Sequence, residues 1–256
     1  MKSILNSAFM AFSMFSILPM PRVSWEKKNM GYLLACLPLV GVVIGLALGG
    51  WMALCRALDF GSLLLGAGLA VIPAVISGGI HLDGFCDTAD ALSSHALPER
   101  KREILKDSHA GAFAIIYGVC YFVLYVALCS EVKTTGPWIM VLAVHQVLAR
   151  SLGAFASVTF PGSGQGGLLE AFRDGAKKRS AGILAVWSLL CLLLLADLSL
   201  AGAGVTLVLG LGALGYVYRM SKREFGGMSG DLAGFLITLL PPVLLLGQLI
   251  VERTMA

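Results

Sequence analysis

The sequence predicts an all-α fold, a polytopic bundle of about seven transmembrane helices preceded by an N-terminal interfacial or re-entrant helix. Three observations favour this fold. Of the 256 residues, 57% are hydrophobic and only 13% are charged, whereas soluble domains contain about 45–50% and about 25%. The hydrophobic residues form segments of roughly 20 residues, the length that crosses a bilayer. Most of the 19 basic residues lie between these segments. We therefore expect one integral membrane catalytic domain over 1–256, surrounded by membrane lipid, with no nucleic acid as a partner.

The first hydrophobic segment, 4–18, is too short for a crossing and ends at Pro19 and Pro21. A cleaved signal peptide is disfavoured, because Lys2 is the only basic residue before this segment and no small-residue cleavage site precedes Pro19. We expect an interfacial or re-entrant helix here, although the sequence leaves open whether residues 1–20 span the membrane.

Seven later segments have the length and composition of membrane spans. The sixth is short and rich in glycine, which makes it the weakest prediction of the set. The predicted spans are 31–54, 61–80, 110–129, 137–158, 181–198, 205–218 and 232–251.

The basic residues predict the orientation of the bundle. Apart from Lys2 and Arg150, only Arg56, Lys133 and Arg253 fall on one side. The other side holds Arg22, Lys27 and Lys28; Arg100, Lys101, Arg102 and Lys106; Arg173, Lys177, Lys178 and Arg179; and Arg219, Lys222 and Arg223. Short cytoplasmic loops retain Lys and Arg, so this second side is predicted to be cytoplasmic. The acidic residues between the second and third spans lie on this cytoplasmic side too. We therefore expect the catalytic chemistry to take place on the cytoplasmic face.

A run of acidic residues, His81-Leu-Asp83-Gly-Phe-Cys-Asp87-Thr-Ala-Asp90, follows the second predicted span. On a helix, carboxylates at i, i+4 and i+7 lie within roughly a 60° arc and repel one another. A hard divalent cation would balance that repulsion, and Mg²⁺ uses one or two carboxylates together with substrate phosphates. We therefore predict Asp83, Asp87 and Asp90 as metal ligands; a solvated polar face is the alternative. His81 is a candidate ligand, phosphate donor or interfacial polar residue.

A fourth carboxylate, in Asp107-Ser108-His109, lies at the start of the third span. Asp107 and His109 are candidates for a second metal or a general base. Alternatively, Asp107 or Ser108 caps the third span by accepting hydrogen bonds from its first amides. The charged segment 99–103, just before, favours a solvated helix whose basic groups can also meet phosphate.

Arg150 lies inside the fourth span, where an ionisable side chain normally faces the bundle interior. We expect it to contact substrate, with an ion pair to an acidic-run aspartate as the alternative. The segment 225–231 contains Gly227 and Asp231 before the last span, where exposed amides can receive an anion. Asp231 itself favours a cap or a metal ligand. The glycine-rich segment 161–167 is expected to be a linker.

These residues resemble the cobalamin synthase family, also called adenosylcobinamide-GDP ribazoletransferase. The resemblance is carried by GGIHLDGFCDTADAL at 78–92, EILKDSHAG at 103–111, FGGMSGDLAG at 225–234 and FSILPMP at 15–21, and it covers nearly the whole chain. It implies that Asp83, Asp87, Asp90 and Asp107 are active-site positions, with His81, Ser108, Gly227 and Asp231 as further ones. The chain departs from the family pattern at Ala91, His109 and Ala112, which affects substrate positioning but leaves the carboxylates.

The resemblance implies a magnesium-dependent transferase of the bacterial inner membrane that acts late in cobalamin (vitamin B12) biosynthesis. A ribose hydroxyl of α-ribazole or α-ribazole 5′-phosphate would attack the cobinamide-bearing phosphorus of adenosylcobinamide-GDP and release GMP. Such a transfer requires mainly positioning and charge neutralisation, and Mg²⁺ on aspartates supplies both. The number of metal ions, the identity of the general base and a homo-oligomer are left open.

Three other functions fit parts of the sequence. A CDP-alcohol phosphotransferase also uses spaced aspartates and Mg²⁺, but its DGxxAR element is missing because Asp87 and Thr88 stand at those positions. A cation-coupled transporter uses buried carboxylates and glycine-broken helices, but its acids should lie near mid-bilayer rather than at span ends. A non-catalytic membrane partner would need the carboxylates only for structure.

Overall fold

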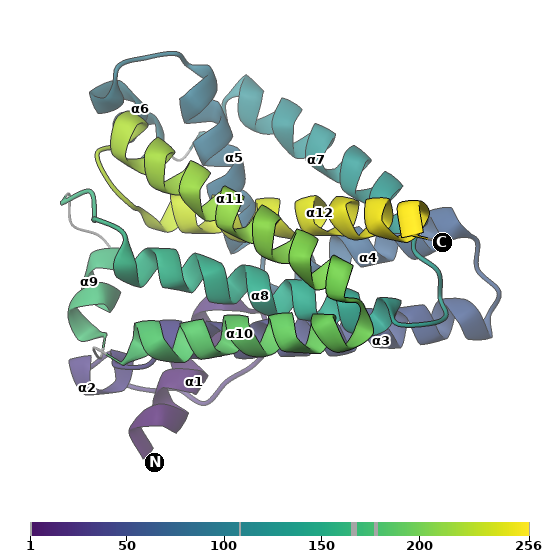
Figure 1. The fold of residues 1–256 in the computed structure, drawn as a ribbon. Coiled ribbons are helices and arrows are strands. Elements are labelled where there is room, and N and C mark those ends of the chain that lie inside the picture. Colours follow the sequence, from purple (N-terminus) through teal and green to yellow (C-terminus); the bar gives the residue numbers. More distant parts are fainter. Residues whose placement is uncertain (1, 108, 165–167, 177–178, 256) are drawn as a thin grey trace.

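The computed structural model describes residues 2–107, 109–164, 168–176 and 179–255, and in these ranges the chain is a bundle of helices without β-strands (Figure 1). The all-α prediction is confirmed. The helices, in chain order, are α1 (Lys2–Phe15), α2 (Lys27–Met30), the short 3-10 helix η1 (Leu34–Cys36), α3 (Leu37–Ala57), α4 (Ser62–Ile76), α5 (Ile80–Ser93), α6 (Pro98–Ile104), α7 (Ala112–Ser130), α8 (Trp138–Thr159), α9 (Leu168–Gly175), α10 (Ser180–Leu198), α11 (Leu200–Glu224) and α12 (Gly230–Met255).

Six of the described helices are long and apolar enough to cross a membrane: η1 with α3, then α7, α8, α10, α11 and α12. The pair α4 and α5 reaches the required length only when the two are taken together. The chain is therefore a multi-pass membrane protein, and five of the seven predicted spans match a described helix closely.

The second predicted span, 61–80, is wrong at its end. Helix α4 stops at Ile76, and α5 begins at Ile80 after a bend of 96°. Gly78 and Gly79 make the bend with φ values of 64° and 77°, which favour residues without a Cβ. Because α5 turns away from the direction of α4, it does not continue the span.

The sixth predicted span, 205–218, is too short. Helix α11 runs unbroken from Leu200 to Glu224 through its glycines. In a membrane the backbone has no water to bond, so glycine breaks a helix less readily than in a soluble protein. Gly202 also permits close packing, because the amide of Gln248 on α12 donates to its carbonyl oxygen at 3.0 Å.

Helix α1 is 14 residues long, or about 21 Å, which is too short to cross a bilayer. The prediction of a short N-terminal helix is confirmed, and its placement at the membrane interface stays a prediction. The helix is fixed to the segment around α2, where the Ser7 hydroxyl donates to the Asn29 carbonyl oxygen at 2.6 Å.

Helix α8 forms the centre of the bundle. In the most apolar stretch of 18 residues in α8, 78% of the residues are buried, compared with 17% in the corresponding stretches of α7 and α10. Helices α3, α10 and α12 surround α8 (Figure 1). The exposed apolar faces of α7 and α10 are the surfaces that lipid would cover.

The basic segments lie at one end of the bundle, as predicted. Figure 1 shows α2, α6 and α9 together with the C-terminal end of α11 at this end, while the C-terminus and the α3–α4 connection lie at the other. At that other end, Lys133 pairs with Glu252 at 3.0 Å and Arg253 with Glu131 at 2.8 Å. The basic end therefore corresponds to the predicted cytoplasmic face.

The close contact of α3 with α8 predicts a strong position effect for glycine substitutions. A Cβ at Gly45 would lie 2.6 Å from the Cβ of Ala143 on α8, whereas Gly50 on the same helix has open space. We expect Gly45→Val to lower the free energy of unfolding in detergent by about 1–3 kcal/mol. Gly50→Val serves as the control, with an expected change within about 0.5 kcal/mol. Equal losses for both variants would contradict the packing.

Candidate functional site

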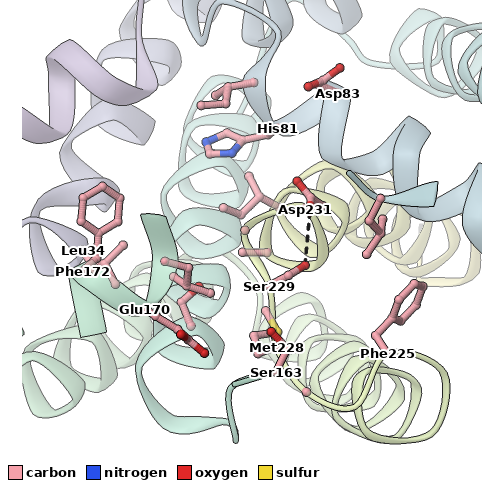
Figure 2. Close-up of a pocket in the computed structure, with 18 of the residues that line it drawn as sticks. Leu34, His81, Asp83, Ser163, Glu170, Phe172, Phe225, Met228, Ser229 and Asp231 are labelled. Carbon is pink, nitrogen blue, oxygen red and sulfur yellow. Dashed lines mark hydrogen bonds between the residues drawn. The ribbon is translucent and has the colours of Figure 1, made fainter. Parts of the chain in front are cut away.

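A concave site that contains several of the predicted residues lies at the basic end of the bundle. It is a cavity of about 330 Å³ formed by side chains from α1, α5, α6, α9, α12 and the loops around 163 and 227. Figure 2 shows His81 and Asp83 of α5 on one side, Ser229 and Asp231 beside them, and Glu170 and Phe172 of α9 opposite. Of the predicted site residues, His81, Asp83, Gly227 and Asp231 line this cavity.

Helix α5 is held against α12 by direct backbone contact. A Cβ at Gly84 would lie 2.7 Å from the carbonyl oxygen of Asp231, and a Cβ at Gly234 would lie 2.9 Å from that of His81. Small residues let two helices approach this closely. The contact brings the acidic run of α5 next to Asp231, although 140 residues lie between Asp90, the last residue of the run, and Asp231.

The carboxylates of α5 and α12 influence one another. Partial burial, followed by the charges of Asp83, Asp231 and Asp90, raises the pKa of Asp87 from 3.8 to about 6. Burial is the larger cause of this shift, and the remainder is the mutual repulsion expected of like charges without a counterion. The structure therefore brings Asp83, Asp87 and Asp231 into one electrostatic cluster.

Ser229 caps the start of α12 and orients Asp231. Its hydroxyl oxygen accepts the amide hydrogen of Leu232 at 3.3 Å and the hydroxyl donates to Asp231 Oδ2 at 3.4 Å (Figure 2). The cap expected of Asp231 is thus supplied by Ser229, a residue that sequence reasoning did not single out. Asp231 is left with its carboxylate in the cavity.

The loop that carries Gly227 packs on the glycine-rich segment after α8. Met228 donates its amide hydrogen to the Pro161 carbonyl oxygen at 2.8 Å, and Gly162 forms an isolated bridge with Met228. Gly227 has a φ of 150°, which suits a residue without a Cβ. Ser163 lines the cavity, so the described part of the expected linker forms a wall of the site; residues 165–167 lie outside the described ranges.

Asp90, the third carboxylate of the run, contacts the start of α7 instead of lining the cavity. Its Oδ1 accepts the amide hydrogen of Ala114 at 3.3 Å. Asp90 therefore caps α7 from a neighbouring helix, a role that was expected of Asp107. The other candidate for the cap, Ser108, lies outside the described residues.

Asp107 lies on the loop before α7 and does not line the cavity. Its carboxylate accepts from the His109 amide at 3.0 Å and approaches His109 Nδ1 at 2.8 Å. These hydrogen bonds lower the pKa of Asp107. The side chain of His109 is 90% exposed, and Ser108 lies outside the described residues. The structure does not bring Asp107 and His109 to the other acids.

His81 separates the large cavity from a smaller one that contains Arg150. Its ring stacks on Phe15 with 5.6 Å between ring centroids, and it lines both cavities. Arg150 lies behind it, outside the large cavity, and donates to the side chain and the carbonyl oxygen of Gln146. The structure therefore gives Arg150 neither the expected substrate cavity nor an aspartate partner among the described ion pairs.

Arg102, Lys106, Glu170 and Phe172 are among the further residues that line the cavity. Arg102 belongs to the charged segment predicted to be solvated, and its side chain is only 22% exposed. The neighbouring Lys101 is buried in an ion pair with Glu224 of α11 at 2.6 Å. For Arg102 and Lys106, the signal in the sequence was the presence of basic groups after the acidic run. No signal in the sequence marked Glu170 or Phe172.

The acidic cluster suits a hard divalent cation without forming a complete cage. In the described part of the chain, no three His, Cys, Asp or Glu side chains converge as a ready-made metal site. Mg²⁺ needs only one or two protein carboxylates when substrate phosphates and water complete its coordination. The repulsion at Asp87 is the electrostatic condition that such a cation would relieve.

Comparison with known proteins gives one consistent result. A family model described as cobalamin-5-phosphate synthase matches residues 7–249. An adenosylcobinamide-GDP ribazoletransferase of Lachnoclostridium phytofermentans is 39% identical over 236 residues, or 91% of this chain and 89% of the relative. Proteins of the same name from Clostridium botulinum and Geobacillus thermodenitrificans are 31% and 29% identical, covering 92% and 93% of this chain and 93% and 92% of their own lengths. No solved structure matches.

The raised pKa of Asp87 predicts a stabilising substitution. The folded state binds this proton more tightly than the unfolded state, so stability is lost as pH rises from 3.8 to about 6. Without divalent cations at pH about 8, Asp87→Asn should raise the free energy of unfolding by about 1 kcal/mol, after allowance for solvent screening. The gain should vanish near pH about 3.5. Asp59→Asn, on an exposed turn, is the control, and a loss of stability in Asp87→Asn at pH about 8 would contradict the repulsion.

The cap on α7 predicts different effects for two aspartates. Asp90→Ala should lower the free energy of unfolding by about 0.5–2 kcal/mol, because the Ala114 amide loses its acceptor. Asp90→Asn retains an oxygen and should lose less. Asp107→Ala, on an exposed loop, should change stability by at most about 0.5 kcal/mol. Chemical denaturation in detergent measures all three, and a larger loss for Asp107→Ala would show that the cap is wrongly assigned.

Proposed function

The chain belongs to the cobalamin-5-phosphate synthase family, and on this premise we propose that it is the transferase that joins adenosylcobinamide-GDP to α-ribazole or α-ribazole 5′-phosphate. The products would be adenosylcobalamin or its 5′-phosphate, and GMP. The observation that carries this proposal is a cavity lined both by the carboxylates Asp83 and Asp231 and by the basic side chains Arg102 and Lys106. Such a lining suits a pyrophosphate, which needs cations around its oxygens.

The proposed reaction is a displacement at phosphorus. A ribose hydroxyl oxygen of the ribazole forms a bond to the cobinamide-bearing phosphorus, and the bond from that phosphorus to the bridging oxygen of the pyrophosphate breaks. The bridging oxygen leaves with GMP, and the hydroxyl proton passes to a base. The chain has to position the two substrates and neutralise charge, which accounts for most of the catalysis in this class of reaction.

Asp83, Asp87 and Asp231 are the proposed holders of Mg²⁺. When bound, Mg²⁺ would neutralise charge on the pyrophosphate and on the leaving GMP. Asp90 was predicted with the first two, and it stays in the proposal as a ligand only through the carboxylate oxygen that does not cap α7. Asp231 takes its place at the cavity, since it lines the cavity together with Asp83 and comes from the opposing helix (Figure 2).

Asp107, His81 and Ser108 remain the proposed residues for proton transfer. His81 lines the cavity and its Nε2 has no hydrogen-bond partner among the described atoms, so it is placed to meet a substrate hydroxyl. Asp107 follows Lys106, whose side chain lines the cavity. A role for Asp107 needs the loop to approach the bound substrates, and the same holds for His109 as a substrate contact.

The basic end of the bundle is proposed to face the cytoplasm in the bacterial inner membrane. The positive charge of short loops at this end favours that orientation, and both substrates would then reach the site from the cytoplasm or the membrane surface. Gly227 would contact substrate through its backbone, because it lines the cavity without a side chain.

The proposal predicts magnesium-dependent turnover that is lost in Asp87→Asn. Purified full-length protein in detergent, given adenosylcobinamide-GDP and α-ribazole 5′-phosphate, should release GMP and form the joined corrinoid only with Mg²⁺. Asp87→Asn should reduce turnover by about 100-fold or more, because transition-state charge loses a preorganised partner, while Asp59→Asn should keep it. Folded protein that makes no product with either ribazole form would overturn the proposal.

The same assay separates the rival functions. A CDP-alcohol phosphotransferase would release CMP from a CDP-alcohol, and a transporter would move a cation into sealed vesicles without GMP release. A non-catalytic partner would give no turnover alone and would gain it when a further protein is added. Near-normal turnover in Asp87→Asn would separately remove the acidic cluster from the mechanism.

Arg102 is expected to bind the guanosine diphosphate moiety. Arg102→Gln should raise the KM for adenosylcobinamide-GDP by about 10-fold, because a charge-assisted hydrogen bond to phosphate is lost, with the KM for the ribazole unchanged. Arg100→Gln is the matched control, since Arg100 lies on the same helix, pairs with Glu103 and is 68% exposed. Equal changes for both arginines would show a general charge effect instead.

A further inference from the structure

A second, much smaller cavity lies behind His81, in the interior of the bundle. It has a volume of about 30 Å³ and is lined by side chains from α4, α5, α7, α8 and α12. His81 and Ile237 are the residues that line both this cavity and the large one. The small cavity is therefore adjacent to the proposed catalytic site but separated from it by two side chains.

The guanidinium group of Arg150 lies at this cavity and is 2% exposed. Its Nη1 donates to the carbonyl oxygen of Gln146 at 3.1 Å and to Gln146 Oε1 at 2.9 Å. Its Nε has no hydrogen-bond partner in the described structure. Neither acceptor carries a charge, and the described ion pairs do not include Arg150.

A buried guanidinium group needs an anion. Arginine stays protonated in proteins, and an unpaired charge in the interior is costly because neutral dipoles only partly replace its hydration. No Asp or Glu is among the residues that line this cavity. The lining instead offers further hydrogen-bond donors, the hydroxyl groups of Tyr121 and Thr238.

The volume limits what the missing anion can be. A cavity of about 30 Å³ has room for one or two water molecules, and a chloride ion is similar in size to a water molecule. A phosphate group, with four oxygens around phosphorus, is too large. We propose that this cavity binds one small inorganic anion of the halide class, in the cell chloride, on the guanidinium group of Arg150.

The bound anion would be a structural counterion. It would lie where α5, α7, α8 and α12 meet and would neutralise the charge buried in the central helix. The inference rests on the charge and volume of this cavity and is independent of the proposed transferase reaction, so each can fail without the other.

Thermal unfolding of the full-length protein tests the site. In neutral detergent at constant ionic strength, the unfolding temperature should rise progressively as chloride or bromide replaces gluconate, because a ligand that binds only the folded state stabilises it. Arg150→Met should abolish this rise. Arg219→Met is the matched control, since Arg219 is exposed, and it should keep the rise. Tyr121→Phe should increase the chloride concentration needed for a given rise by about 2- to 10-fold.

Two results would overturn the proposal. Equal unfolding temperatures in chloride and gluconate would mean that water or nothing fills the cavity. An Arg150-dependent rise with inorganic pyrophosphate in chloride-free buffer would assign the guanidinium group to the substrate instead. If Arg150→Met does not fold, anomalous scattering from crystals of the unmodified protein grown in bromide decides: a peak beside Arg150 supports the site, and its absence contradicts it.

Discussion

The candidate site depends on the backbone contact between α5 and α12. Gly84 and Gly234 remove the side chains that would keep these helices apart, and the contact forces Asp83 and Asp87 towards Asp231 against their mutual repulsion. Packing of two apolar helices over their length supplies the free energy that holds like charges together. The acidic cluster is thus an arrangement of like charges imposed by the fold, and carboxylates with perturbed pKa values of this kind are typical of functional sites. The double-glycine bend after α4 is equally necessary, because it turns α5 across α12 in the first place.

The sequence predicted the helices well because apolar length is almost the only requirement for crossing a bilayer. The prediction failed where backbone conformation, and not hydropathy, determines the structure. Gly78 and Gly79 end α4 within an apolar stretch, so hydropathy alone extended the helix to residue 80. In α11 the opposite error arose, because glycines that break helices in water do not break this one.

Sequence analysis identified several residues of the candidate site, but it did not identify the residues that they contact. Asp83, His81, Gly227 and Asp231 were identified and do line one cavity. The role of Asp90 depends on the amide of Ala114, and the role of Ser229 depends on the direction in which α12 begins; neither is encoded in local spacing. Glu170 and Phe172 enter the site through the packing of α9, and a single sequence contains no signal for such a long-range contact. The family resemblance is confirmed, but the motifs that carry it do not include Glu170 or Phe172.

The ion pair between Lys101 and Glu224 has a mechanical consequence. Glu224 is the last residue of α11, and the loop with Gly227 follows directly, held by a hydrogen bond from the Gly227 amide to the Ser221 carbonyl oxygen at 2.8 Å. Helix α6, which carries Arg102, is therefore fastened to the same helix end that carries the loop leading to Asp231. Arg102 and Asp231, two oppositely charged residues that line the cavity, are therefore linked through the same end of α11. A displacement of this helix end would shift both residues together, so the separation of the two charges would change less than the position of either.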